Sequence, residues 1–446
     1  MKWSAWLLIV LISVGLGLRL WQFESRLSFD FDNEYFAWEA KKILVDHKLT
    51  LVGQEASTQG VFIAPGYTYL TAGIYALYKG NPIAGGVTAV LFGVATTVML
   101  YLVGKNIKDE VAGLIAAGFY QLSLFGMDWD WGGSALNGML FIPLLWLYGW
   151  LTRKWWLNFL AVGLAFHFHP TAIILAICSL VLALKHRQEI ARKELFAGLV
   201  LVLICLSPLA LFDLRHGFSI TKHILAVSAP DNIKDQSVVA LLRVLLNSVV
   251  GWVDASQYAT SYKVVMPVLV LMAISGWRKR ATQGRFWLAF WLLLTTTGAA
   301  LLAYPRHVTD YYSMVVYGPS LVAVAVVIAG LKKTVLKIGA AVFLIWFGLT
   351  NFHLWQNFSK SHNLQAKKKV VAWIIDHAQG RRFDISDSFI TLGYNTGYNY
   401  LFHWQGASLD KLDPQVIYSL VIPPGYKDIT PKYEAAGIGV IWDEIP

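Results

Sequence analysis

Three carboxylates spaced two residues apart, Asp30, Asp32 and Glu34, follow directly on the first long apolar run of the sequence, residues 3–22. Carboxylates so close to hydrocarbon are costly, and membrane proteins that carry them usually use them. A partly buried carboxylate has a raised pKa and is basic enough to take a proton from an acceptor hydroxyl or amine. We therefore expect Asp32 or Asp30 to be a general base, and Glu34 to position the acceptor or help to hold a metal.

The same three residues also fit a structural role. The apolar residues between Tyr35 and Leu44 have helical spacing, and an aspartate in front of a helix is a good N-cap. Glu34 would then lie near the positive end of that helix. For any single acid the two interpretations stay open, whereas the group as a whole indicates a functional site.

A second acidic pattern, MDWDW, places Asp128 and Asp130 two residues apart. Two oxygen ligands at this spacing can face one hard cation, because alternate side chains of an extended segment share a face. A polar loop with interfacial tryptophans is the alternative interpretation. A divalent cation is therefore a candidate cofactor, but the sequence identifies no set of metal ligands.

Two Arg-His pairs stand at the ends of apolar runs: Arg215 with His216, and Arg306 with His307. On the face of the membrane where basic residues are rare, a forked guanidinium is suited to binding phosphate oxygens. Such a charge would also stabilise a departing phosphate group. The alternative is an ion pair with a neighbouring aspartate, Asp213 or Asp310.

His167 and His169 are two residues apart and so do not share a helical face. This spacing argues against a zinc pair and favours a polar turn near the site. Asp310, Tyr311 and Tyr312 fit either interfacial anchors or the lining of a sugar pocket.

These residues belong to a membrane protein. Of the 446 residues, 56% are hydrophobic and only 14% are charged, whereas soluble domains carry roughly 25% charged residues. The net charge of +10 is explained mainly by the Lys and Arg of cytoplasmic loops. Cys178 and Cys205 lie inside apolar runs, so no structural disulfide is expected. The sequence contains no nucleotide-binding loop motif, which disfavours nucleotide-driven transport.

A span needs about 20 apolar residues, and eleven apolar runs are predicted to cross the membrane: 3–22, 83–104, 110–127, 136–152, 155–168, 170–185, 194–213, 263–278, 286–304, 311–330 and 334–355. Basic clusters mark the cytoplasmic side, and they all fall on one side only if residues 61–79 do not cross. A full span over 61–79 is the alternative. With the first choice, the N-terminus is cytoplasmic and the C-terminus is extracytoplasmic.

This threading divides the chain into two predicted domains. Residues 1–355 form an α-helical transmembrane catalytic domain with a long first outer loop (23–82) and a long fourth outer loop (214–262). Residues 356–446 contain a helical pattern and short β-like runs separated by turn residues, which predicts a small extracytoplasmic α/β domain. The polar and ionisable segments then converge on the outer face, where we expect the site.

Five segments, taken in order, carry a resemblance to a known superfamily: FDFDNEYFAWEAKKIL, TQGVFIAPGYTYL, HFHPTAIIL, SPLALFDLRHGF and HVTDYYSMVVYGPSL. They are similar to the acidic first loop, the glycine/proline–tyrosine segment, the His-containing turn, the end of the seventh span and the aspartate–tyrosine segment of the GT-C integral-membrane glycosyltransferases. The sequence resembles most the group of protein O-mannosyltransferases, aminoarabinose transferases and bacterial dolichyl-phosphate-mannose-protein mannosyltransferases.

The resemblance implies a polyprenyl-phosphate sugar donor, an inverting reaction and an Asp of the first outer loop as the base. Asp32 is the position that matches that Asp, with Glu34 as the neighbouring acid. Relatives often have Asp and Glu adjacent, whereas Asn33 intervenes here, so Asp30 remains a competitor. The second outer loop, where relatives often carry Arg or Asn, reads DWDWGGSALN here and adds Asn137 to the candidates.

We therefore expect a glycosyltransferase of the plasma membrane that moves a hexose or pentose from a lipid-phosphate donor to a lipid, polysaccharide or protein acceptor. Membrane lipids are its other partners, and no nucleic acid is expected. The alternatives are a lipid-linked sugar flippase or transporter, and a lipid-linked oligosaccharide ligase or polymerase. The catalytic candidates are Asp32, Asp30 and Glu34, and the substrate-binding candidates are Asp128, Asp130, Asn137, His169, Arg215, His216, Arg306, His307, Asp310, Tyr311 and Tyr312.

Overall fold

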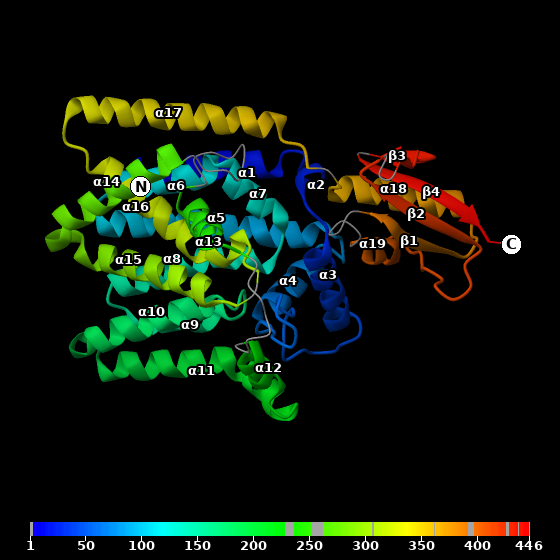
Figure 1. Cartoon of the computed structure of the whole chain (residues 1–446), viewed down its shortest axis with the longest axis horizontal. Coiled ribbons are helices and arrows are strands. Elements are labelled where there is room, and N and C mark those ends of the chain that lie inside the picture. The colour runs from blue at the N-terminus through cyan, green and yellow to red at the C-terminus, as the bar shows by residue number, and fades with distance from the viewer. Residues whose placement is uncertain are drawn as a thin grey trace.

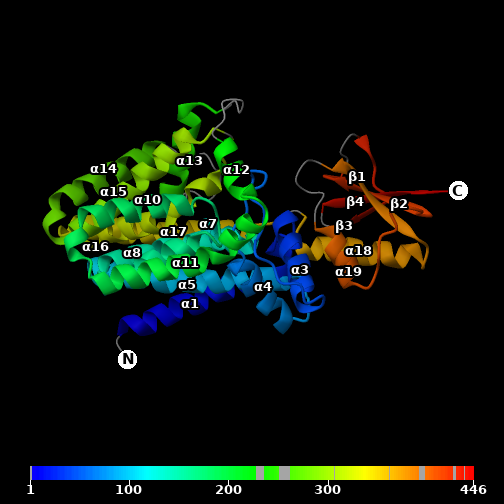
Figure 2. The same cartoon turned by 90° about the horizontal axis from the view of Figure 1, so that it is seen from below.

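The computed structural model describes residues 3–227, 236–250, 262–305, 307–360, 362–390, 397–424, 428–435 and 437–445. A bundle of helices lies beside a small α/β part (Figures 1 and 2). We call the end of the bundle that faces this part, on the right in Figure 1, the α/β end. The predicted phosphate ligand Arg306 and part of the predicted fourth outer loop lie outside the described residues.

The bundle begins with α1 (Trp3–Leu20), α2 (Phe23–Arg26), α3 (Phe31–Leu44), α4 (Gly66–Leu77), α5 (Ile83–Ile107), α6 (Glu110–Leu122), α7 (Leu124–Gly132) and the short 3₁₀ helix η1 (Ala135–Asn137). It continues with α8 (Gly138–Leu151), α9 (Trp155–Ala165), α10 (Ala172–Lys185), η2 (Arg187–Glu189), α11 (Arg192–Arg215), α12 (Ser219–Val227) and α13 (Val238–Val250). It ends with α14 (Tyr262–Arg278), α15 (Arg280–Ala303), η4 (Asp310–Val316), α16 (Tyr317–Ala329) and α17 (Thr334–Asn357).

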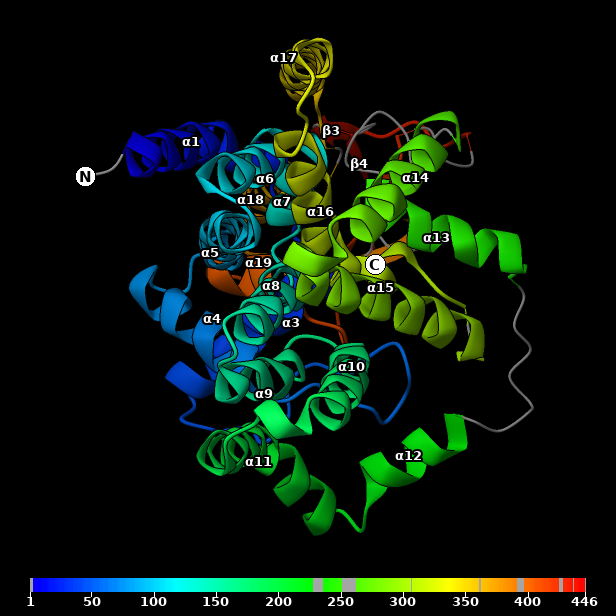
Figure 3. The same cartoon turned by 90° about the vertical axis from the view of Figure 1, so that its left-hand side faces the viewer.

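Among the described residues, six helical segments are long and apolar enough to cross a membrane: α1, α5, α11, α15, the joined η4 and α16, and α17. The pair α6 and α7 adds a seventh, which is bent by 61°. Helices α5, α8 and α16 lie inside the bundle, whereas α1, α11 and α17 lie at its edge (Figure 3) and expose many apolar side chains. Long apolar helices that are exposed in this way are suited to contact with lipid. The chain is an integral membrane protein.

Ten of the eleven predicted spans each coincide with one helical segment, and the span 110–127 corresponds to α6 and the start of α7. Some of these helices are short. Helices α8, α9 and α10 have 14, 11 and 14 residues, fewer than the roughly 20 that a straight span needs. The number of crossings therefore stays a prediction. Helix α4 has 12 residues, which is about 18 Å at 1.5 Å per residue, and this length fits the prediction that residues 61–79 do not cross.

Two segments differ from what the sequence indicated. The predicted fourth outer loop contains α12 and α13 in its described part, because their apolar residues recur with helical spacing. The predicted span 110–127 breaks at Ser123, where the backbone is extended. The N–H of Leu124 donates there to Oδ1 of Asn351 in α17, at 2.8 Å.

The α/β part confirms the predicted fold class for the end of the chain. It contains α18 (Leu364–Ala378), β1 (Phe383–Ile390), α19 (Tyr398–Trp404), β2 (Val416–Ile422), β3 (Tyr433–Ala435) and β4 (Ile438–Glu444). The sheet has the strand order β1-β2-β4-β3, with β1 parallel to β2 and the other neighbours antiparallel. The apolar run of β2 is nearly all buried, as expected for a central strand.

Helices α5 and α6 approach each other closely at two glycines. A Cβ on Gly104 would lie 2.8 Å from the Cα of Gly113, and a Cβ on Gly113 would lie 2.4 Å from the carbonyl oxygen of Tyr101. Small residues allow membrane helices to pack at such short distances. Gly118, also on α6, has no other atom within 4 Å of its Cβ position.

We predict that Gly113→Ala lowers the free energy of unfolding by about 1–3 kcal/mol, because the added methyl group forces α5 and α6 apart. The matched variant Gly118→Ala should lose no stability, since alanine favours a helix over glycine by up to about 1 kcal/mol. Thermal unfolding of the purified protein in detergent compares the two variants. Equal changes in both would contradict the close contact of α5 with α6.

Candidate active site

Five segments far apart in the sequence line one cavity of about 310 Å³. The lining consists of Asp32 from α3, Gln54 to Ser57 and Ile63 from the following loop, Ala135 and Leu136 from η1, Phe168 to Pro170 from the turn between α9 and α10, and Tyr311 from η4. The cavity thus brings together three of the predicted site residues, Asp32, His169 and Tyr311.

Asp32 is the acid that faces this cavity. Nε2 of Gln54 donates a hydrogen bond to Oδ1 of Asp32 at 2.6 Å. Burial raises the pKa of the Asp32 carboxyl above its usual range, the hydrogen bond from Gln54 opposes that rise, and the negative charge of Asp30 adds to it. A carboxylate with a raised pKa and a neutral donor as partner is suited to accepting a proton.

The other two predicted catalytic acids face away from the cavity, because a helix turns by about 200° over two residues. Asp30 is the N-cap of α3. The two carboxylate oxygens of Glu34 accept the backbone N–H groups of Gly397 and Tyr400 in the α/β part, each at 2.8 Å. Asp30 and Glu34 therefore have structural roles, as the cap of α3 and as a contact to the α/β part. Helix capping does not explain why Asp32 faces the cavity.

Asn33, which separates Asp32 from Glu34, makes hydrogen bonds to two parts of the structure. Its Oδ1 accepts the backbone N–H of Asp30 at 3.2 Å and so completes a capping box. Its Nδ2 donates to the carbonyl oxygens of Gly132 and Gly133, at 3.1 and 3.0 Å. Asn33 therefore ties the start of α3 to the end of α7.

The ring of His169 lies between a threonine and two tyrosines. Its Nδ1 accepts the backbone N–H of Thr171 at 3.2 Å and lies 2.8 Å from the hydroxyl of that residue. Burial lowers the pKa of His169 to about 4. The ring is therefore neutral at pH 7, and because Nδ1 is an acceptor, its proton is on Nε2. It packs edge-on against Tyr311 and Tyr312, with ring centroids 5.5 Å apart in each case.

The loop after α3 is joined to the end of α15 and to η4 by the hydroxyls of Tyr304 and Tyr311. Ser57 and Tyr311 are hydrogen-bonded at 3.0 Å, and Thr58 and Tyr304 at 2.9 Å. Asp310 begins η4, and its backbone carbonyl accepts the hydroxyl of Ser313 at 2.9 Å. The wall of the cavity on this side is thus aromatic with hydroxyl groups at its edge.

The predicted basic residues that the structure describes do not line the cavity. Arg215 and His216 are exposed at the end of α11, which contacts the loop after α3 through Phe212 and Phe62, with ring centroids 5.7 Å apart. Asp213, the alternative partner of Arg215, accepts the hydroxyl of Thr221 in α12 at 2.6 Å. His307 is also exposed and lies 3.5 Å from Gln236.

The two aspartates of the D-x-D pattern diverge, because their segment is the helix α7 and not an extended strand. Asp128 is partly exposed and pairs with Lys360 at 3.0 Å. Asp130 is fully buried on the other side of the helix. Among the described residues no three His, Cys, Asp or Glu side chains converge, so those residues supply no ligand set for a divalent cation.

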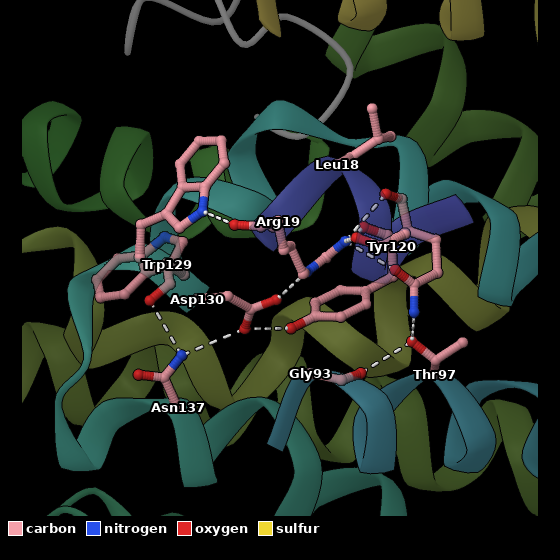
Figure 4. A network of polar contacts seen from close by, with 12 residues as sticks. Leu18, Arg19, Gly93, Thr97, Tyr120, Trp129, Asp130 and Asn137 are labelled. Carbon is pink, nitrogen blue, oxygen red and sulfur yellow. Dashed lines mark hydrogen bonds and ion pairs between the residues drawn. The ribbon is translucent and has the colours of Figure 1, made fainter. Parts of the chain in front are cut away.

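Asp130 is the centre of a buried polar network (Figure 4). Its carboxylate accepts Nε of Arg19 at 2.6 Å, the hydroxyl of Tyr120 at 2.8 Å and Nδ2 of Asn137 at 3.3 Å. A further nitrogen of Arg19 donates to Oε1 of Gln121 at 2.7 Å. Asp130 and Asn137 thus join α1, α6 and α7 to η1, which lines the cavity, and hold the cavity wall instead of lining it.

The sequence reasoning missed the polar residues Gln54, Glu55 and Ser57, which line the cavity beside Asp32. They belong to the predicted first outer loop and stand just before the APGY segment. They lie between the segments FDFDNEYFAWEAKKIL and TQGVFIAPGYTYL, and this position is the sequence feature that could have identified them.

We predict that Asp130→Asn lowers the free energy of unfolding by about 3–5 kcal/mol, because it leaves the buried charge of Arg19 without its counter-ion. Asp128→Asn, the same substitution two residues away in a partly exposed pair, should cost no more than about 1 kcal/mol. Thermal unfolding in detergent measures both. A small effect of Asp130→Asn would show that Arg19 does not depend on this carboxylate.

Comparisons with known proteins agree with this architecture. Residues 63–212 match the model of the family described as dolichyl-phosphate-mannose-protein mannosyltransferase. The crystal structure of ArnT from Cupriavidus metallidurans bound to undecaprenyl phosphate is similar to the chain with a TM-score of 0.65 at 10% identity, over 99% of this chain and 98% of that one. The oligosaccharyltransferase of Archaeoglobus fulgidus in complex with Zn and sulfate has a TM-score of 0.55 at 12% identity, over 93% and 67%. No curated sequence matches the chain.

The match to ArnT extends over nearly the whole length of both chains and includes the α/β part as well as the bundle. An identity of 10% supports the fold and no closer relation. The chain is an integral membrane protein whose fold is similar to that of ArnT, and its residues 63–212 resemble the dolichyl-phosphate-mannose-protein mannosyltransferases.

Proposed function

We propose that the chain is an inverting glycosyltransferase that transfers a sugar from a polyprenyl-phosphate donor to an acceptor hydroxyl or amine in the cavity beside Asp32. The observation that carries the proposal is the carboxylate of Asp32, which lines the cavity and whose one hydrogen-bond donor among the described residues is the neutral amide of Gln54. The likeness to a protein crystallised with undecaprenyl phosphate supports the class of donor.

The reaction needs a base on one side of the sugar and a leaving group on the other. Asp32 takes the proton of the acceptor, whose oxygen or nitrogen attacks the anomeric carbon. The bond from that carbon to the phosphate oxygen breaks, and its electron pair leaves with the polyprenyl phosphate. Because the new bond forms opposite the bond that breaks, the anomeric configuration inverts.

The aromatic lining of the cavity, with His169 and Tyr311, is suited to binding the sugar. The end of α11 is suited to binding the phosphate. Neutral His169 has Nε2–H available as a donor to a sugar hydroxyl or a phosphate oxygen, and Tyr311 adds an aromatic face and a hydroxyl. Arg215 at the end of α11 is our proposed contact for the phosphate, where a guanidinium stabilises the charge that the leaving group gains.

The distribution of basic residues supports a cytoplasmic N-terminus and an extracytoplasmic α/β part. Lys108, Lys279 and Lys332 are near enough to interact electrostatically, and they follow the ends of α5, α14 and α16 that lie away from the α/β end (Figure 1). Since basic loops stay in the cytoplasm, the cavity would open on the other side. The acceptor, whether lipid, polysaccharide or protein, is then found outside the cytoplasm.

We predict that Asp32→Asn abolishes transfer, because an amide cannot accept the proton of the acceptor. The assay incubates purified protein with a panel of labelled polyprenyl-phosphate sugars and measures release of free polyprenyl phosphate. Asp46→Asn, at the other end of α3 in an exposed pair with Lys41, is the matched control and should keep full activity. Near-normal turnover by Asp32→Asn would rule out the proposed base, and movement of labelled lipid across liposomes without donor consumption would favour a flippase.

The pH dependence of transfer gives a second test. The Asp32 carboxyl must be ionised to act, so kcat/KM falls as the pH drops through its raised pKa. Gln54→Leu removes the hydrogen bond that opposes this rise, and the acidic limb should move to higher pH. Gln59→Leu, the same change at an exposed position of the same loop, should leave the limb in place. A limb that moves to lower pH, or does not move in Gln54→Leu, would contradict the role of this hydrogen bond.

A further inference from the structure

The α/β part contacts the bundle at the segment that carries the cavity acid. The backbone N–H of Leu364, at the start of α18, donates to the carbonyl oxygen of Leu27 at 2.9 Å. One turn later Nζ of Lys367 donates to the carbonyl oxygen of Phe29 at 2.7 Å. Lys368, next on the same helix, pairs with Glu24 at 2.8 Å. Helix α18 therefore contacts α2 and the residues between α2 and α3.

Lys367 is an unusual residue for such a contact, because its ammonium group is buried. The side chain is 2% exposed, and Nζ lies 5.0 Å from the ring centroid of Tyr398. Burial lowers the pKa of Lys367 to about 8, while the negative charges of Asp30 and Glu34 oppose this change. A lysine is rarely buried to this degree unless it is paired, and here its ammonium group binds the carbonyl oxygen of Phe29 and is near the carboxylates of Asp30 and Glu34.

Glu34 makes the reciprocal contact from α3 to the α/β part. It accepts two backbone N–H groups at the start of α19, so a carboxylate joins α3 to α19, while the ammonium group of Lys367 joins α18 to Phe29, two residues before α3. The contact is close enough to require a glycine: Gly397 has φ +93°, and a Cβ there would lie 2.2 Å from the carbonyl oxygen of Phe29.

We propose that Lys367 and Glu34 form a latch by which the α/β part holds the first turn of α3 and so directs Asp32 into the cavity. Lys367 is then a positioning residue for the reaction, acting through α3 without touching substrate. The effect on the reaction rests on the proposed function, whereas the contact that fixes the first turn of α3 does not. Since Asp32 lies three residues after Phe29, a shift of the first turn moves the carboxylate directly.

The test compares Lys367→Met with Lys369→Met, which removes the same charge at an exposed position of the same helix. Hydrogen–deuterium exchange of the full-length protein in detergent follows peptides covering residues 27–40. We expect faster exchange of these peptides in Lys367→Met and unchanged exchange in Lys369→Met. Gly397→Ala, which opens the same contact from the backbone side, should reproduce the change. Peptides from α5 serve as an internal measure that the bundle remains folded.

The second readout is the steady-state rate of transfer. A displaced base costs on the order of 10²-fold in rate for each ångström of misplacement, so Lys367→Met should lower kcat strongly while KM for the lipid donor changes little. A general loss of structure would instead lower the amount of active protein and make exchange faster throughout α5 as well. Lys369→Met should keep wild-type kcat.

The two readouts separate the latch from the function on which it rests. Unchanged exchange of residues 27–40 in both Lys367→Met and Gly397→Ala would overturn the latch, as would faster exchange with wild-type kcat. If the wild-type protein consumes no polyprenyl-phosphate sugar, the proposed function fails, and exchange still decides whether the α/β part holds α3. Faster local exchange together with a selective loss of kcat supports the proposal.

Discussion

A carboxylate is a stronger base when its surroundings raise its pKa and no cationic partner lowers it. Among the described residues the hydrogen-bond partner of the Asp32 carboxylate is one neutral amide, at the edge of a cavity. The first turn of α3 must therefore be fixed by groups other than this carboxylate. Its neighbours supply them: Asp30 caps the helix, Asn33 binds the end of α7 and Glu34 binds the start of α19.

Asp130 shows the opposite use of the same side chain. It lies in an apolar bundle where an unpaired charge is very costly, and it is matched by Arg19, Tyr120 and Asn137 so that every oxygen has a donor. A carboxylate that is neutralised in this way binds elements together and has no capacity left for a substrate. Asp130 is bound by a cation and holds helices together, whereas Asp32 is bound by a neutral amide and faces a cavity. The same side chain can therefore have two different uses in a chain with only 14% charged residues.

Much of this arrangement could be predicted from the sequence. The apolar runs, the α/β pattern at the end of the chain and the segments containing Asp32, His169 and Tyr311 all follow from local patterns. What could not be predicted depends on register and on distant partners. Which acid of the triplet enters the cavity is decided by where α3 begins, and Arg19 is 111 residues from Asp130 and Lys367 is 338 residues from Phe29. Such pairings leave no signal in a local window.

The most direct test of the central claim is a structure of the protein with an unreactive polyprenyl-phosphate sugar analogue. The account predicts the sugar in the cavity between Asp32 and Tyr311, with the anomeric carbon between the Asp32 carboxylate and the phosphate. The prenyl chain should leave toward the exposed apolar helices. A sugar bound elsewhere, with the cavity beside Asp32 left empty, would contradict the account.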